Sequence, residues 1–147
     1  MNDKKIKLDK VKEIIENWMP VNKLFRLSVE DIDDGYVKIN VPFRKEFIGD
    51  ALQNLWHGGI LASIADTAGG IAAATTTSFP QDKVNTTDIR IDYLKGATNR
   101  DIIAIAKVIK EGKRIINADM KLFHEEDDLI AIARASYSVL RKSNEQK

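Results

Sequence analysis

The sequence predicts an α+β fold, and two observations carry this prediction. A long apolar stretch of helix-forming residues occupies the middle of the chain, from about residue 57 to residue 76. A shorter helical pattern and two strand-like runs precede it, and four long strand-like runs follow it. Helix, two strands, long helix and four strands is an order typical of α+β domains, in which helices pack on an antiparallel sheet.

The composition is that of one globular domain. A chain of 147 residues supports a single core, and contents of 44% hydrophobic and 31% charged residues are ordinary for a soluble protein. The net charge of +1 gives no general attraction for nucleic acid, so any binding of an anion must be local. The absence of cysteine excludes disulfides, thiolate catalysis and zinc–thiolate sites.

The sequence shows no signal peptide, no membrane span and no pair of metal ligands, and these features bear on localisation and metal binding. The N-terminal segment is basic, but no apolar region follows it, so we expect no secretory signal. The longest apolar stretches fall short of the roughly 20 residues that a membrane span needs, and we therefore expect a cytoplasmic protein. His57 and His124 stand far apart without a second ligand at helical spacing, which predicts no metal site. We expect His124, next to the acidic residues 125–128, to lie at the surface.

The elements can be placed in order along the chain. Residues 8–19 are predicted to form an amphipathic helix that ends at Pro20. We assign residues 1–20 to the same domain as residues 21–142, and residues 143–147 to a polar tail. Strands are predicted at 23–29 and 36–41, with a turn at 33–35, and again at 84–94, 102–111, 114–123 and 129–141. Residues 43–55 show no regular pattern.

The most informative segment is the start of the central helix. His57, Gly58 and Gly59 precede an apolar helix that carries a single acid, Asp66. Backbone amides at a helix start attract developing negative charge, because they lack partners within the helix and the dipole is positive there. Asp66 lies nine residues beyond His57, about 13.5 Å along the axis at 1.5 Å per residue. One helix cannot bring both groups to one atom, which indicates a site shared between two subunits.

A helical wheel places the apolar and the small residues of this helix on different sides. Ile60, Ile64 and Ile71 fall on one stripe, which we expect to face the sheet. Asp66 falls on the other side among small residues that include Gly69 and Gly70. Because glycine within a helix costs about 1 kcal/mol relative to alanine, the pair indicates close approach of another backbone or of a ligand.

The segment resembles a known family. His57, Gly58, Gly59, Ala65, Asp66, Thr67 and Ala68 are similar to the helix-opening motif of the hotdog-fold thioesterases, in the branch of the phenylacetyl-CoA thioesterases. The resemblance implies a hotdog fold, in which a curved antiparallel sheet wraps a long central helix. It also implies hydrolysis of an acyl-CoA thioester by a homodimer or homotetramer, in which strand 84–94 pairs across a two-fold axis. The amides of Gly58 and Gly59 would polarise the carbonyl, with the Gly58 amide as the catalytic one, and His57 would have a supporting or orienting role. Asp66 of the neighbouring subunit would act as general base or nucleophile.

The same resemblance suggests further site residues. Thr86, near Asp88 and Tyr93, would help to position water, or would be an ordinary strand residue. Asn54, Gln53 or Asp50 would orient the water, although the family pattern is displaced here and each of the three could simply cap a loop. The CoA phosphates would contact basic residues, which are otherwise solvated strand-edge side chains: Arg90, Lys95, Lys113 and Arg114. The acyl pocket would be lined by apolar residues, which favour a medium or aromatic acyl group: Trp56, Phe43, Phe47 and Ile48. No cofactor is implied, since CoA is part of the substrate.

Three other functions remain open at this point. A hotdog hydratase or dehydratase that acts on acyl-CoA would share the fold, but it typically pairs an acid with a catalytic histidine in another arrangement. A non-catalytic protein that binds acyl-CoA would share the site without the reaction. A nucleic-acid-binding protein is the weakest alternative, because the chain shows no basic stripe or helix-turn-helix.

Overall fold

The structure, a computed structural model, describes residues 2–142. The helices are α1 (Asn2–Asn17), α2 (Pro20–Leu24), the 3-10 turn η1 (Lys45–Phe47) and α3 (Gly58–Thr75). The strands are β1 (Ser28–Asp33), β2 (Tyr36–Val41), β3 (Ile48–Asp50), β4 (Leu55–Trp56), β5 (Lys83–Tyr93), β6 (Ile102–Glu111), β7 (Ile115–Phe123) and β8 (Leu129–Leu140).

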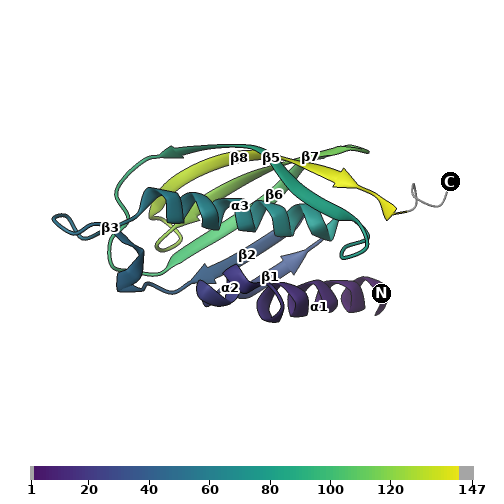
Figure 1. Ribbon diagram of the computed structural model, residues 1–147, viewed down its shortest axis with the longest axis horizontal. Coiled ribbons are helices and arrows are strands. Elements are labelled where there is room, and N and C mark those ends of the chain that lie inside the picture. Colours follow the sequence, from purple (N-terminus) through teal and green to yellow (C-terminus); the bar gives the residue numbers. More distant parts are fainter. Residues whose placement is uncertain (1, 143–147) are drawn as a thin grey trace.

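Six strands form one antiparallel sheet that curves around α3 (Figure 1). Their order across the sheet is β1-β2-β6-β7-β8-β5, and β3 and β4 form a separate two-stranded hairpin beside the start of α3. Helices α1 and α2 lie next to β1, outside the layer that contains α3. This confirms the predicted fold class, a long central helix wrapped by a curved antiparallel sheet with a helix at the N-terminus.

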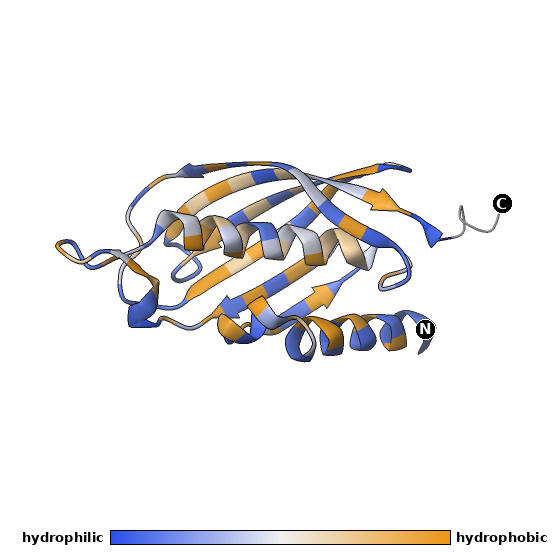
Figure 2. Ribbon diagram, viewed as in Figure 1, coloured by the Kyte–Doolittle hydropathy of each residue, from blue (hydrophilic) through white to orange (hydrophobic). Residues whose placement is uncertain are grey.

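The core lies between α3 and the concave face of the sheet. Strand residues alternate between this core and the outer face, as the banded colouring of the strands shows (Figure 2). In β2, for example, Val37, Ile39 and Val41 are fully buried while Lys38 and Asn40 between them are not. Val11 and Ile15 of α1 join the same core, so the N-terminal helix packs on the domain.

The central helix and the last four strands are confirmed, with ends that differ from the prediction by at most one residue. The strand predicted at 23–29 is wrong: residues 20–24 form α2, and β1 begins only at Ser28. Pro20 is the first residue of α2, a position at which its fixed φ suits a helix and its missing N–H costs nothing. Arg26, with φ of 53°, lies in the left-handed region between α2 and β1.

The two edges of the sheet differ. At one edge, β1 is six residues long and α1 packs beside it. At the other edge, β5 is eleven residues long and pairs on one side only, with β8. A long edge strand presents a row of N–H and C=O groups that another strand can pair with.

Candidate active site

His57 caps the start of α3. Its backbone is extended, with φ of −66° and ψ of 129°, and its Nδ1 accepts a hydrogen bond of 2.9 Å from the N–H of Gly59. A Cβ on Gly59 would lie 2.8 Å from Cε1 of the imidazole, so glycine is needed there for the cap to form. On the other side, a Cβ on Gly49 would lie 2.7 Å from Cα of His57. The histidine therefore has the supporting position that the sequence suggests.

The cap leaves one amide free at the helix start. Because the N–H of Gly59 donates to His57, that amide is not available to a substrate, contrary to the expectation that both glycine amides would bind the carbonyl. The N–H of Gly58 has no hydrogen-bond partner among residues 2–142. The hydroxyl of Tyr93 donates to the carbonyl oxygen of Gly58 at 2.6 Å, which fixes the following peptide. Partial burial raises the pKa of Tyr93, so its hydroxyl remains a donor.

The carboxylate of Asp66 is held from one side. The hydroxyl of Thr86 donates to Oδ1 of Asp66 at 2.7 Å. The hydroxyl of Tyr137 lies 2.9 Å from the carbonyl oxygen of Asp66 and 3.3 Å from Oδ1. Within the described part of the chain, Oδ2 of Asp66 has no hydrogen-bond partner, and the residue is partly exposed. The two hydroxyls thus fix the rotamer of Asp66 and leave one oxygen free to act.

Tyr137 explains the two glycines in the middle of α3. A Cβ on Gly69 would clash with the Tyr137 hydroxyl and lie 2.8 Å from Sδ of Met120. A Cβ on Gly70 would meet only the Tyr137 ring, at 3.6 Å. Gly69 is buried against the sheet, so the expected approach of another backbone or a ligand is wrong at this position. The close neighbour is a side chain of β8. Burial, chiefly, and the nearby Asp66 raise the pKa of Tyr137 well above its usual range.

Within one subunit the two halves of the site stay apart. Gly58 and Asp66 are eight residues apart on α3, about 12 Å along the helix axis. Strand β5 runs in the opposite direction alongside α3, with Tyr93 next to Gly58 and Thr86 next to Asp66. The structure therefore brings Thr86 to Asp66, a contact that the sequence did not predict, and leaves the free amide of Gly58 elsewhere.

The residues suggested for orienting water lie in the turn between β3 and β4. Asp50 accepts hydrogen bonds from the backbone N–H groups of Leu52 and Gln53 and from the side chain of Gln53. Asn54 occupies the left-handed region with φ of 60°. This turn projects from the left end of the molecule in Figure 1, beyond the start of α3, so none of these residues approaches Asp66 of the same subunit.

The aromatic residues suggested for an acyl pocket pack with one another. The rings of Phe47 and Trp56 stack at 5.3 Å between centroids, and Phe43 meets Trp56 edge-on at 5.9 Å. Trp56 is 4% exposed, and its Nε1 donates to the carbonyl of Arg100. These rings fill the core below the start of α3, and they offer little surface to an acyl group in this subunit.

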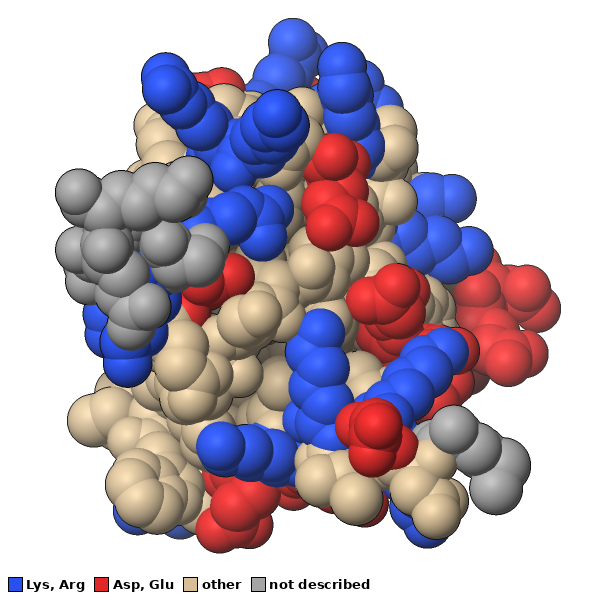
Figure 3. Space-filling model, turned by 90° about the vertical axis from the view of Figure 1, so that its right-hand side faces the viewer, with Lys and Arg blue, Asp and Glu red and all other residues tan. Residues whose placement is uncertain are grey.

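Three of the four basic residues suggested for CoA lie at opposite ends of the molecule, and the fourth, Arg90, lies in the middle of β5 opposite Arg134. Lys95 lies next to Ile130 near the start of β8, and the carbonyl of Arg114 accepts from Val139 near the end of β8. Nine residues of strand separate these points, about 30 Å. At the end that carries Lys113 and Arg114, basic side chains are interspersed with acidic ones (Figure 3). Lys95 pairs with Asp128, and Arg90 with Asp92 at 3.3 Å.

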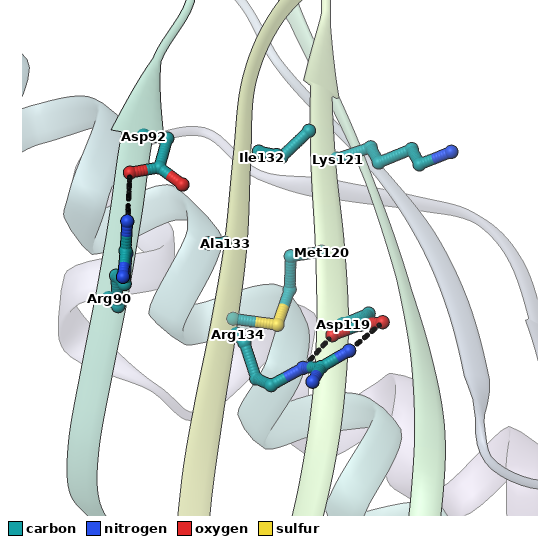
Figure 4. A pocket seen from close by; sticks show the side chains of 8 residues that line it. All are labelled: Arg90, Asp92, Asp119, Met120, Lys121, Ile132, Ala133 and Arg134. Atoms are coloured by element: carbon teal, nitrogen blue, oxygen red, sulfur yellow. Dashed lines mark hydrogen bonds and ion pairs between the residues drawn. The ribbon is translucent and has the colours of Figure 1, made fainter.

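A depression of about 450 Å³ on the other face of the sheet is lined by Arg90 but by none of the other three basic residues (Figure 4). Arg134 crosses it to Asp119 with hydrogen bonds of 2.6 and 3.0 Å, and Arg90 turns to Asp92. Both arginines that line it are thus already paired with carboxylates. It touches neither Gly58 nor Asp66.

The sequence missed one residue and one contact, and it misplaced a further residue. Tyr137 and the contact of Tyr93 with Gly58 depend on chain segments that are 71 and 35 residues apart, and no local pattern marks them. His124 is 5% exposed, so the expectation of a surface position is wrong. Its Nε2 accepts from the N–H of Thr98 and its Nδ1 donates to the carbonyl of Asp101, which fastens the loop after β5.

Residues 2–142 contain no group of three or more acidic or histidine side chains placed to hold a metal ion. Over the same residues, no helix is both long enough and apolar enough to span a bilayer.

Comparison with known proteins assigns the family. The sequence profile described as the thioesterase superfamily matches residues 53–131, just over half of the chain. The chain belongs to the thioesterase superfamily. The resemblance to the hotdog thioesterases is thereby confirmed, and so is the prediction that the protein is a thioester hydrolase.

Relatives of this thioesterase cover most of its length. It is 26% identical over 141 residues to the medium/long-chain acyl-CoA thioesterase YigI of Escherichia coli, with 88% of this chain and 91% of YigI covered. A solved structure from the thioesterase superfamily is 31% identical, with a TM-score of 0.84, and 92% of this chain and 99% of that chain are covered. The PaaI protein of E. coli, from the phenylacetic acid degradation operon, is 18% identical with a TM-score of 0.82 over 92% and 94% of the two chains, which shows a common fold.

Proposed function

We propose that this thioesterase hydrolyses acyl-CoA at a site built from two subunits. The observation that carries the proposal is the separation of two half-sites along α3: a free amide at Gly58 and a free carboxylate oxygen at Asp66, about 12 Å apart. Each half-site lacks what the other has. Support for CoA as the carrier comes from the name of the relative YigI, an acyl-CoA thioesterase.

The edge strand offers a way to join the half-sites. A two-fold axis near Arg90, about midway between Thr86 and Tyr93, would pair β5 with its own copy in antiparallel fashion. That axis exchanges the two ends of β5. It therefore brings Tyr93 of one subunit close to the partner's Thr86. Since Tyr93 is hydrogen-bonded to Gly58 and Thr86 to Asp66, Gly58 then lies near the partner's Asp66. The dimer gains two identical sites and loses its long exposed edge.

The chemistry at each site follows from the groups that remain free. The N–H of Gly58, with the positive end of the helix dipole behind it, receives the thioester carbonyl oxygen and the negative charge that develops on it. Oδ2 of the partner's Asp66 either takes a proton from water as the water attacks the carbonyl carbon, or attacks that carbon directly and is then released by water. In both routes the C–S bond breaks and the products are a carboxylic acid and the CoA thiol.

The same axis assembles the basic residues. Lys95 lies at the end of the subunit that carries Gly58, and Lys113 and Arg114 lie at the opposite end. Exchange of the ends places Lys95 of one subunit near the partner's Lys113 and Arg114. Two or three such charges around one opening suffice for the CoA phosphates, which lie far from the thioester. Either amide of Gln53 and Asn54, in the turn beyond the start of α3, would hold the attacking water.

The test begins with release of free thiol from a panel of acyl-CoA substrates. Asp66→Asn keeps the size of the side chain but removes its basicity, and we expect kcat to fall about 100- to 10,000-fold. Gly58→Pro removes the free N–H. The variant should still fold, because proline suits the first position of a helix and His57 already has the extended backbone that precedes proline.

Mixed dimers decide whether the site is shared. A dimer of one Asp66→Asn chain and one Gly58→Pro chain has one site with both groups intact, so part of the activity should return when the two inactive variants are mixed. Mixed dimers that form and remain inactive would show that both groups act from one chain. Tight binding of acyl-CoA without thiol release by the unaltered protein would identify a binding protein instead of an enzyme.

A further inference from the structure

A cleft of about 190 Å³ lies beside the two residues whose hydroxyls hold the Asp66 carboxylate. Thr86 and Tyr137, which both contact Asp66, form one of its ends. From there it follows α3 past Gly70 to Ala74. Asp66, Gly70 and Ala74 are spaced four residues apart and share one face of the helix, a reach of about 12 Å.

The walls of the cleft are apolar. Ile15 and Met19 come from α1 and the segment that follows it, and Val21 from α2. Phe79 and Val84 close the other side. Since Gly70 has no side chain and Ala74 has only a methyl group, the floor leaves space between these walls. The N-terminal helices, which contain none of the proposed catalytic groups, thus form one side of a channel that begins beside Asp66.

One polar group in the wall lacks a partner. Asn22 is 3% exposed and lines the cleft, and its Nδ2 donates to the carbonyl of Ile15 at 3.0 Å. Its Oδ1 is buried and has no hydrogen-bond partner within residues 2–142. A buried acceptor without a donor is uncommon in a folded protein, and an alkyl chain in the cleft would supply none, so Asn22 contributes to the wall of the cleft and makes no polar contact with its occupant.

We infer that this cleft receives the acyl chain of the thioester. The inference rests on the proposed function and names its substrate class: an unbranched acyl group of medium length. Such a chain would extend from the carbonyl carbon, next to the Asp66 carboxylate, along Gly70 and Ala74 and against Met19. A short acyl group such as acetyl would not reach the N-terminal helices.

Two substitutions fill the cleft from different sides. Gly70→Leu adds a side chain to its floor, and a Cβ there meets only the Tyr137 ring at ordinary contact distance, so the helix can accept it. Met19→Trp adds bulk to the wall. Leu24→Trp is the matched control, since Leu24 lies in α2, is 58% exposed and is not part of the cleft.

The measurement is the ratio of kcat/KM for octanoyl-CoA to kcat/KM for acetyl-CoA. Because one methylene in an apolar pocket changes discrimination by about tenfold or more, we expect both filled variants to lower this ratio at least tenfold. Leu24→Trp should leave it within about twofold of the unaltered enzyme. An unchanged ratio in both filled variants overturns the cleft and leaves the thioesterase proposal intact.

A second measurement separates the two proposals. Binding of octanoate, followed by calorimetry, needs no turnover. We expect the unaltered protein and Leu24→Trp to bind octanoate alike and Gly70→Leu to bind at least tenfold more weakly. If no acyl-CoA of any length is hydrolysed but this binding pattern holds, the proposed function fails and the cleft stands. Equal binding of octanoate by all three proteins would refute the assignment of the cleft as the acyl site, whatever the kinetics show.

Discussion

Tyr137 joins the core of the sheet to the candidate acid. Its hydroxyl approaches both the backbone and the carboxylate of Asp66, and it is 1% exposed. Because an ionised phenol would be buried next to a carboxylate, the pKa of Tyr137 is raised, and the hydroxyl keeps its proton well into the alkaline range.

This has a consequence for stability at high pH. In the unfolded chain Tyr137 ionises near pH 10, whereas in the folded protein it does not. Ionisation therefore stabilises the unfolded state as pH rises above 10. The contribution of Tyr137 to the free energy of unfolding is complete below pH 10 and falls by about 1.4 kcal/mol for each pH unit above it. Tyr137→Phe should show a shallower decline between pH 10 and pH 11 in urea denaturation. Parallel curves for the two proteins would contradict the buried, protonated hydroxyl.

His57 allows a test of support against catalysis. As the cap of α3, its Nδ1 accepts from Gly59, and asparagine is also a good cap while alanine is not. We expect His57→Ala to lose about 0.5–2 kcal/mol of stability and most of its activity, because fraying of the first turn moves the Gly58 amide. His57→Asn should recover much of both. Inactivity of a stable His57→Asn protein in the thiol-release assay would instead indicate that the imidazole takes part in the reaction.

The sequence could predict those site residues that a local pattern marks. Gly58 and Asp66 are candidates because of a helix start and an isolated acid on an apolar helix, whereas Thr86 and the neighbouring Tyr93 are suggested by the family resemblance. The contact of Tyr93 with Gly58 and the role of Tyr137 could not be predicted, because each meets its partner only after strands far along the chain have been placed. Trp56 shows the converse, since its apolar character suits a ligand pocket and a protein core equally.

Among the elements, α3 carries adjacent glycines with opposite roles. Gly69 lies against Tyr137 and Met120, whereas Gly70 has room for a methyl group. Alanine within a helix is favoured over glycine by about 1 kcal/mol. We therefore expect Gly70→Ala to raise the free energy of unfolding by up to that amount. Gly69→Ala should lower it by about 1–3 kcal/mol, the usual cost of overpacking, and thermal or urea unfolding measures both.

The double variant shows whether the clash is the cause. In Gly69→Ala with Tyr137→Phe, the hydroxyl that meets the new methyl group is gone, and only the flexible Met120 remains close. The loss in the double variant should be smaller than the sum of the losses in the two single variants. Strict additivity would mean that Gly69 is required for another reason.

The elements themselves were predictable where one signal dominated. Four strands with clear alternation were placed to within one residue, because each has one buried and one solvated face. Pro20 carries two meanings, the end of one helix or the first residue of the next, and the second applies here. The helical wheel placed Gly69 away from the sheet because it assumes that a helix packs on a flat surface. The curved sheet instead covers more of the circumference of α3.

At the scale of the whole molecule, the proposed site makes activity depend on assembly. If each site needs two chains, specific activity should fall on dilution in step with the fraction of dimer. Sedimentation and thiol release measured over the same range of protein concentration should give the same midpoint. A monomer that retains full specific activity would show that one chain suffices.

The long free edge of β5 also bears on inhibition. A short peptide that reproduces the sequence of β5 could pair with that edge, and it would occupy the place of the partner while leaving each subunit folded. Such a peptide would bear no likeness to acyl-CoA, and more substrate would not displace it. Its potency would rise as the enzyme becomes more dilute, because its competitor is the second subunit.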